Sequence, residues 1–111
     1  MKVEIEDSFI EYGAGYCKDS ISMDDIDKAL TDLIQMDDEH GWFFVGVYGT
    51  ITPEFVLELD KNLTLFLNLS EDENYRIKLE SIELARNFFH LLLSGNIGGL
   101  KKEILKRQKN Q

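Results

Sequence analysis

The sequence predicts a single α+β domain built on an antiparallel β-meander of about four strands. Four consecutive runs between Trp42 and Leu79 alternate apolar and polar residues with a period of two. Segments with helical periodicity flank this block, one before the sheet and two after it. The length of 111 residues suits one domain, residues 1–111, with one hydrophobic core.

The four alternating runs define the predicted sheet. They are Trp42–Tyr48, Glu54–Leu59, Leu63–Leu69 and Tyr75–Leu79, within a meander over 42–79. A period of two places one set of side chains on the face that packs against the helices. That inward set is expected to be Phe43, Val45, Val47, Phe55, Leu57, Leu59, Leu63, Leu65, Leu67, Leu69, Tyr75, Ile77 and Leu79.

Two of the connections between these strands carry residues that indicate local structure. Asp60–Asn62 is short enough for a hairpin, in which Asn62 is expected to take the left-handed conformation. Ser70 followed by Glu73 also matches a capping box, so a helix beginning there is the alternative to the fourth strand. The alternation over 75–80 favours the strand.

The helices are expected over 22–37, 81–94 and 98–108. Ser22 and Ser81 are suitable N-caps for the first two, and Gly95 follows the second in the usual C-terminal position. The third is short, amphipathic and basic. The apolar stripe of the first helix is Met23, Ile26, Leu30, Leu33 and Ile34.

Residues 1–16 are expected to form an edge strand or a cover for the sheet. Residues 2–6 alternate like a short edge strand. The apolar segment that follows is interrupted by glycines. Its large residues are Phe9, Ile10, Tyr12 and Tyr16.

The charge of the chain is strongly acidic and unevenly distributed. There are 21 acidic and 12 basic residues, for a net charge of −9. Residues 1–74 hold 18 acids and 4 bases, whereas residues 75–111 hold 3 acids and 8 bases. Such a field repels nucleic acid and anionic membranes and attracts basic proteins, although it also serves solubility alone. One cysteine and the absence of a signal-like or membrane-spanning run predict a cytoplasmic protein.

No motif predicts catalysis. The chain offers only His40 and His90 as imidazole bases, and His90 is expected to be a structural side chain at the core edge. Cys17 is expected to be a half-buried free thiol. The acidic segments 37–40 and 71–73 lack the spacing of a calcium loop, and residues 95–102 lack the ending of a P-loop. We therefore predict a protein that is not an enzyme and that uses no metal and no cofactor.

The face opposite the inward set is unexpectedly aromatic. A sheet with one side in water should be polar there. Instead this face would carry Trp42, Phe44, Gly46, Tyr48, Val56 and Phe66. Two explanations stay open: residues 9–16 cover the face or add a strand to it, or part of it is an aromatic contact surface rimmed by carboxylates. Complete burial of Trp42, Tyr48 and Phe66 within the monomer would eliminate the second.

The segment from Ile26 to Leu93 resembles small bacterial immunity proteins, the antidotes of contact-dependent growth inhibition and related polymorphic toxin systems. The resemblance rests on a capped acidic helix, the run Gly41–Val47, two further strands and the closing helix Ser81–Phe89. It implies a stoichiometric inhibitor whose acidic surface docks on a basic toxin domain, commonly a nuclease, and blocks its active site. It assigns no individual binding residue.

The function predicted from these observations is an acidic protein-binding inhibitor of a basic toxin domain, with no nucleic-acid or membrane partner. Acids steer association and pair with Lys or Arg, while aromatics supply the desolvated contact. The residues expected to bind are Asp37, Asp38, Glu39, Glu71, Asp72, Glu73, Asp24, Asp27, Trp42 and Tyr48. The alternatives are a nucleic-acid-mimicking inhibitor of a DNA- or RNA-binding protein, and a small metabolite-binding domain or enzyme.

Overall fold

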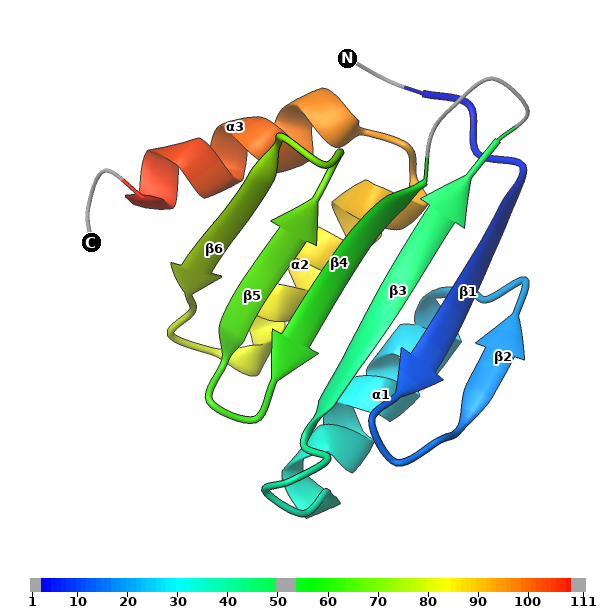
Figure 1. Cartoon of the computed structure of the whole chain (residues 1–111), viewed down its shortest axis with the longest axis vertical. Coiled ribbons are helices and arrows are strands. Elements are labelled where there is room, and N and C mark those ends of the chain that lie inside the picture. Colours follow the sequence, from blue (N-terminus) through cyan, green and yellow to red (C-terminus); the bar gives the residue numbers. More distant parts are fainter. Residues whose placement is uncertain (1–2, 50–53, 109–111) are drawn as a thin grey trace.

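A computed structural model describes residues 3–49 and 54–108 and has an α+β fold of two layers. Within those residues the strands form one antiparallel sheet of six, in the order β2-β1-β3-β4-β5-β6, with helices behind it (Figure 1). The elements in chain order are β1 (Asp7–Tyr12), β2 (Cys17–Asp19), α1 (Met23–Gln35), β3 (Trp42–Tyr48), β4 (Phe55–Asp60), β5 (Thr64–Asn68), β6 (Asn74–Lys78), α2 (Ile82–Leu93) and α3 (Ile97–Gln108). The α+β class, the one helix ahead of the meander β3–β6 and the two helices after the sheet are confirmed.

The predicted meander of about four strands is present as β3–β6, but the sheet has six strands because the N-terminal segment contributes two more. β1 and β2 form a hairpin whose turn contains Gly15 at a φ of +109°, a conformation that glycine adopts readily. β1 also pairs with β3, so it is an interior strand and β2 is the edge. Of the edge strand predicted over 2–6, residues 3–6 lie in no strand and residue 2 is outside the described residues.

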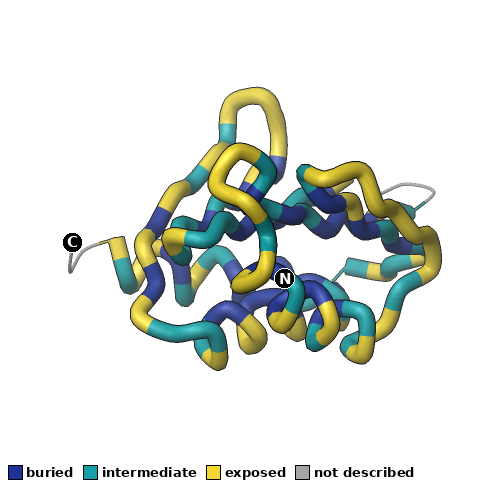
Figure 2. The backbone as a smooth tube through the Cα atoms, turned by 90° about the horizontal axis from the view of Figure 1, so that it is seen from below, coloured by how far each residue is buried: buried dark blue, intermediate teal, exposed yellow. Residues whose placement is uncertain are grey.

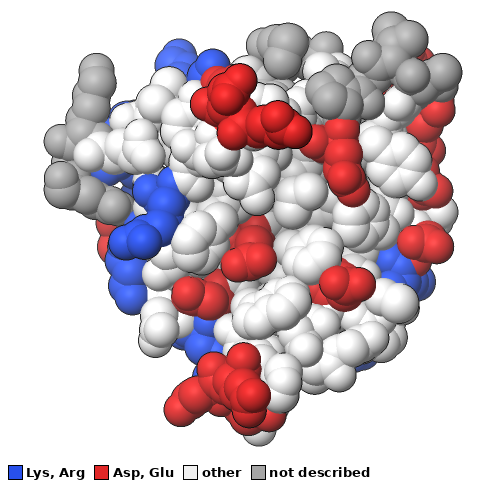
Figure 3. Space-filling model, in the orientation of Figure 1, with Lys and Arg blue, Asp and Glu red and all other residues white. Residues whose placement is uncertain are grey.

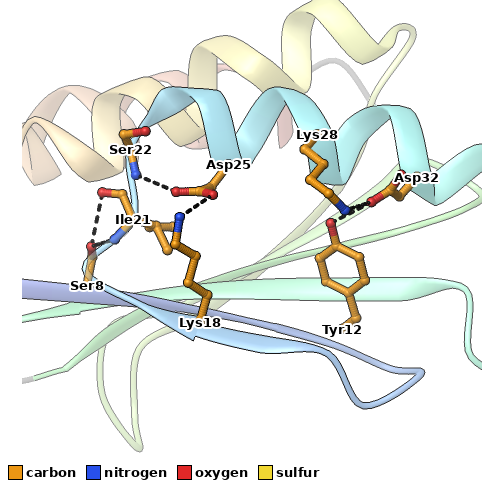
Figure 4. Close-up of polar contacts among 8 residues, drawn as sticks. All are labelled: Ser8, Tyr12, Lys18, Ile21, Ser22, Asp25, Lys28 and Asp32. Carbon is orange, nitrogen blue, oxygen red and sulfur yellow. Dashed lines mark hydrogen bonds and ion pairs between the residues drawn. The ribbon is translucent and has the colours of Figure 1, made fainter.

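Polar contacts attach α1 to the β1–β2 hairpin (Figure 4). The Ser8 hydroxyl accepts the backbone N–H of Ile21 at 3.0 Å, just before the helix begins. The Asp25 carboxylate accepts the backbone N–H of Ser22, the N-cap residue, at 3.0 Å and pairs with Lys18 of β2 at 2.9 Å. These contacts fix where α1 begins relative to the sheet.

The core lies between the strand layer and the helix layer. In the edge-on view of Figure 2 the buried positions lie between the strands and the helices, whereas the outer turns of the helices are exposed. The rings of Phe43 in β3 and Phe89 in α2 stack with centroids 5.2 Å apart, which ties the two layers together. α3 packs against α2 and β6 and buries Ile97, Leu100 and Ile104. Ile34 departs from the predicted stripe, because its side chain is 65% exposed.

The predicted inward set is confirmed, with two of its members only partly buried against the core. Every member from Phe43 to Leu79 is buried except Leu63 and Tyr75, which are half-buried. Leu63 adopts the left-handed conformation (φ +63°) in the β4–β5 hairpin, where Asn62 was expected to do so. The Asp60 carboxylate accepts the N–H groups of both Asn62 and Thr64, and these bonds hold the turn in this form. Asn74–Lys78 forms strand β6, so the alternative helix beginning at Ser70 is wrong.

Candidate functional site

The face of the sheet turned away from the helices, the open face, is not covered by any described segment. Residues 9–16 were expected to fold across this face or to add a strand to the sheet, and they add to the sheet without folding across the face. Ile10 and Tyr12 point into the core, whereas Phe9 lies on the open face beside β3. Trp42 and Phe66 are half-buried and Tyr48 is 40% exposed, so the aromatic contact surface is not eliminated.

Four aromatic rings follow one another along the open face of β3 and β1. Trp42 stacks on Phe44 with centroids 5.8 Å apart and planes 12° from parallel. Phe44 meets Phe9 edge-on at 6.0 Å, and Phe9 lies 6.5 Å from Tyr48. Their separations lie in the range of favourable aromatic pairs. We refer to Trp42, Phe44, Phe9 and Tyr48 as the aromatic strip.

Two glycines set the positions of rings in the strip. A Cβ atom on Gly46 would lie 2.3 Å from the ring of Phe9, so the absence of a side chain there lets the ring lie across β3. A Cβ atom on Gly13 would lie 2.7 Å from the indole ring of Trp42. The sequence therefore shapes the strip through residues that have no side chain of their own.

Carboxylates flank the aromatic strip on both neighbouring strands. On the β1 side Glu11 lies opposite Phe44 and Asp7 lies opposite Tyr48. On the β4 side, register places Glu58 opposite Phe44 and Asp60 opposite Trp42. The two rows are separated by two strand spacings, about 10 Å. Figure 3 shows acidic side chains scattered among uncharged ones on this face, with Lys and Arg gathered mainly at the margin over β6.

The central acids of this arrangement lack partners within the molecule. Among the described residues, Glu11 and Glu58 make no hydrogen bond and no ion pair. Half-burial raises the pKa of the Glu58 carboxyl above its usual value, and the charge of Asp60 on the same strand raises it further. Glu58 lies between Phe44 and Phe66 on the adjacent strands. A cation brought to this position would meet a carboxylate that is partly desolvated and unpaired.

The predicted acidic loops lie at opposite ends of the sheet and do not form one patch. Asp37, Asp38 and Glu39 precede β3, where Asp38 lines a hollow together with Trp42, Asp60 and Lys61. The turn between β5 and β6 lies at the other end because β5 runs antiparallel to β4. It contains Glu71, Asp72 and Glu73.

Several predicted site acids already have partners. The Asp37 carboxylate accepts the backbone N–H of His40 at 2.7 Å, and Asp38 lies 3.4 Å from the Lys61 ammonium. The hydrogen bond from Lys101, with a smaller contribution from Tyr75, lowers the pKa of Glu73. Glu73 thus joins the β5–β6 turn to α3.

The helix acids face away from the strip. Asp27 of α1 pairs with Arg86 of α2 at 2.6 Å, which lowers the pKa of Asp27. Asp24 is exposed in the first turn of α1. Both belong to the layer behind the sheet, so they cannot share one contact surface with Trp42 and Tyr48.

Sequence reasoning missed Phe9, Glu11 and Glu58 as site residues. Glu58 and its neighbours had been assigned to the correct face, but nothing in the pattern singled out one acid. Phe9 and Glu11 could be placed only once β1 was known to pair with β3, a long-range contact. The sequence signal that could have placed them was the period of two over 9–12, which puts Phe9 and Glu11 on the face opposite Ile10 and Tyr12.

Among the described residues, neither the His40 nor the His90 imidazole hydrogen-bonds to a serine, threonine or cysteine side chain, so no nucleophile–imidazole pair is formed. A hollow of about 510 Å³ lies between the segment 5–8, the start of α1 and the end of α2, with His90 at its wall. Hydrogen bonds from Ser20 and from the backbone of Ser8 lower the pKa of Asp7 there, so this carboxylate favours its ionised form. His90 and Cys17 are both exposed, so the expectations of a core-edge imidazole and a half-buried thiol were wrong.

Within residues 3–49 and 54–108, no group of three or more His, Cys, Asp and Glu side chains is placed so that it could hold a metal ion. No helix of that part of the chain has the length and apolar character needed to cross a membrane. Comparisons with protein-family models, curated proteins and solved structures found no match for this chain.

Proposed function

We propose that this protein is an acidic inhibitor of the immunity type, which binds a basic toxin domain such as a nuclease through the open face and neutralises it stoichiometrically. The observation that carries the proposal is the aromatic strip, flanked on both sides by carboxylates and left uncovered by the described chain. Partly exposed aromatic rings are the side chains that dominate protein contacts. The unpaired acids add specificity for a cationic surface.

The charge of the whole molecule supports the same kind of partner. A net charge of −9 accelerates encounter with a basic protein at low ionic strength and slows encounter with an acidic one. Arg76 and Lys78 are the open-face bases of β6, which is separated from the strip by β4 and β5. They lie outside the two rows of carboxylates that flank the strip.

The alternation of rings and acids favours a protein contact over nucleic-acid mimicry. A mimic needs a regular array of negative charge that replaces phosphates. On the rung of Phe44 the order across the sheet is Glu11, Phe44, Glu58 and Phe66, so each acid adjoins an aromatic ring. Such a surface offers apolar area and charge together, as the desolvated centre of a protein interface does.

The proposal can be tested with the captured partner. The tagged protein would be mixed at low salt with an extract of its native host, and a bound basic protein would be identified, purified and assayed for toxin activity. We expect inhibition to be complete at one equivalent. Phe44→Ala should weaken it by a factor of about 30, the effect of losing a central aromatic contact. Ile34→Ala, which removes an exposed apolar side chain from α1, is the matched control and should have no effect.

Two outcomes would contradict the proposal. One is full activity of the captured protein in the presence of one equivalent of this chain. The other is equal inhibition by the Phe44→Ala and Ile34→Ala variants. Competition with duplex DNA for the same partner tests the alternative: if DNA does not displace this chain, the contact lies away from the nucleic-acid site of the partner and the mimic is excluded.

A further inference from the structure

The backbone of the open face limits what can lie on it. The aromatic strip belongs to β1 and β3, and both strands pair with a neighbour on each side. Their backbone N–H and C=O groups are therefore used in the ladders of the sheet. An extended segment gains backbone hydrogen bonds at a sheet edge, not on a sheet face. The occupant of this face must satisfy its own backbone, as a helix or a second sheet does.

The width and length of the strip suit a helix. Its apolar rings lie between two rows of carboxylates about 10 Å apart, and a helix with its side chains is about 10–12 Å across. Trp42–Tyr48 spans about 20 Å, the length of roughly 13 helical residues. A flat partner sheet would extend further sideways and would also meet Arg76 and Lys78 on β6.

The charges disfavour a pairing of two copies of this chain strip against strip. Two open faces brought together would place carboxylates of the same sign within an interface that neither copy neutralises near the strip. A helix with an apolar stripe and basic flanks fits better. Its stripe would cover the rings while Lys or Arg side chains reach outward to acids on either side.

We infer that the occupant of the open face is an amphipathic helix of a basic protein, lying along the aromatic strip. Its cationic residues meet Glu11 and Asp7 on the β1 side and Glu58 and Asp60 on the β4 side. The inference rests on the proposed function for the face and for the sign of the partner's charge. It adds that the partner binds through a helix and that this helix lies along β3.

The test uses a synthetic peptide of Leu and Lys as the probe. The peptide is about 18 residues long, roughly 27 Å as a helix, with Leu at helical spacing so that it forms one apolar stripe. A second peptide of the same composition alternates Leu and Lys and forms a two-faced strand instead. A third replaces Lys with Glu. Trp42 is the only tryptophan of the chain, so its fluorescence reports binding at the strip directly.

The helical Leu–Lys peptide should bind at least about tenfold more tightly than the alternating peptide, and the Leu–Glu peptide should not bind. Amide shifts in nuclear magnetic resonance should map to β1, β3 and β4. Phe44→Ala should lose about tenfold in affinity while Ile34→Ala keeps it. Glu11→Gln with Glu58→Gln should weaken binding more than the charge-matched pair Glu83→Gln with Glu103→Gln on the helices.

Three results would overturn the inference. They are equal affinity for the helical and alternating peptides, amide shifts confined to the helices or to the β6 edge, and a salt-resistant dimer of this chain closed by the open face. If a captured basic protein loses affinity for the Phe44→Ala variant but no helical peptide binds, the helical occupant is refuted. The proposed function still stands in that case. Inhibition of that protein unaffected by Phe44→Ala would overturn the proposed function itself.

Discussion

The ring of Phe9 lies across Gly46 of the neighbouring strand, where a Cβ atom would be 2.3 Å from Cε1 and Cζ of that ring. Phe9 thereby connects Phe44 to Tyr48 and makes the aromatic strip continuous. A glycine in the middle of a strand weakens that strand, because it adds no packing and loses more chain entropy on folding. Here the Phe9 ring packs over Gly46 and offsets the loss of stability that the glycine causes.

This contact predicts a strong coupling between the two residues. Gly46→Ala should lower the free energy of unfolding by about 1–3 kcal/mol, because the new methyl group displaces the Phe9 ring. In a Phe9→Ala background the same change should cost little, since nothing then occupies the space. Urea unfolding of the four proteins of the cycle measures the coupling. Phe66→Ala is the control background, where the full cost of Gly46→Ala should remain; an equal cost in both backgrounds would contradict the contact.

The sequence predicted the meander and its inward face because a period of two is a local property. Each strand from β3 to β6 carries that pattern by itself, and burial of Leu57, Leu67 and Ile77 confirms it. β1 was harder because its pattern is short and is followed by Gly13 and Gly15. Its partner β3 lies beyond α1, so only the packed structure fixes their register.

The candidate site was only partly predictable for the same reason. Trp42 and Tyr48 were correctly placed on the second face by alternation alone. The acidic loops drew attention because their charges are consecutive in the chain, although the structure separates them in space. Glu11 and Glu58 are isolated acids in sequence and become a pair only through the register of three strands.

The hydrogen bond between Tyr12 and Asp32 should contribute to stability. The hydroxyl of the buried Tyr12 donates to Asp32 at 2.9 Å, and burial followed by this bond raises the pKa of Tyr12. Tyr12→Phe should lower the free energy of unfolding by about 1.5–3 kcal/mol at pH 7, the range for bonds to charged groups. Tyr16→Phe, at an exposed ring, should change it little.

The cost of Tyr12→Phe should also depend on pH. Lys28, and after it Tyr12, lowers the pKa of Asp32 below the usual 3.8. The folded state therefore favours ionised Asp32, and this stabilisation is complete above the unfolded pKa and lost as pH falls through the folded value. Urea unfolding should show a smaller cost at acid pH than at neutral pH. An identical cost at both would mean that the charge of Asp32 is not involved.

Glu58→Gln should stabilise the isolated protein at neutral pH. Burial and the charge of Asp60 raise the pKa of Glu58 above the usual 4.5, so the ionised form is disfavoured in the folded state. That penalty is present above the folded pKa and disappears as pH falls below the unfolded one. The gain should therefore be found at pH 7 and vanish near pH 4. Glu11→Gln removes the same charge from an exposed position and should give a smaller gain.

Acids in the loops and acids beside the strip should affect different rate constants for the captured partner. The loop variant Asp37→Asn with Asp38→Asn and Glu39→Gln removes exposed charge at one end of the sheet, so it should slow association a few-fold at low salt. Its effect should disappear at high salt, because exposed charges are screened. Its dissociation rate should be unchanged. Surface plasmon resonance at two ionic strengths separates these quantities.

The strip variant Glu11→Gln with Glu58→Gln should act on dissociation. Both acids would be covered by the partner, where each pairs with a cation in a desolvated setting and its loss leaves that cation unpaired. The dissociation rate should rise about tenfold or more, and high salt should not restore it. A loop variant that raised the dissociation rate equally would show that the contact extends to 37–39. In that case the hollow shared by Asp38, Trp42 and Asp60 would be the point at which the contact passes from the strip to the loop.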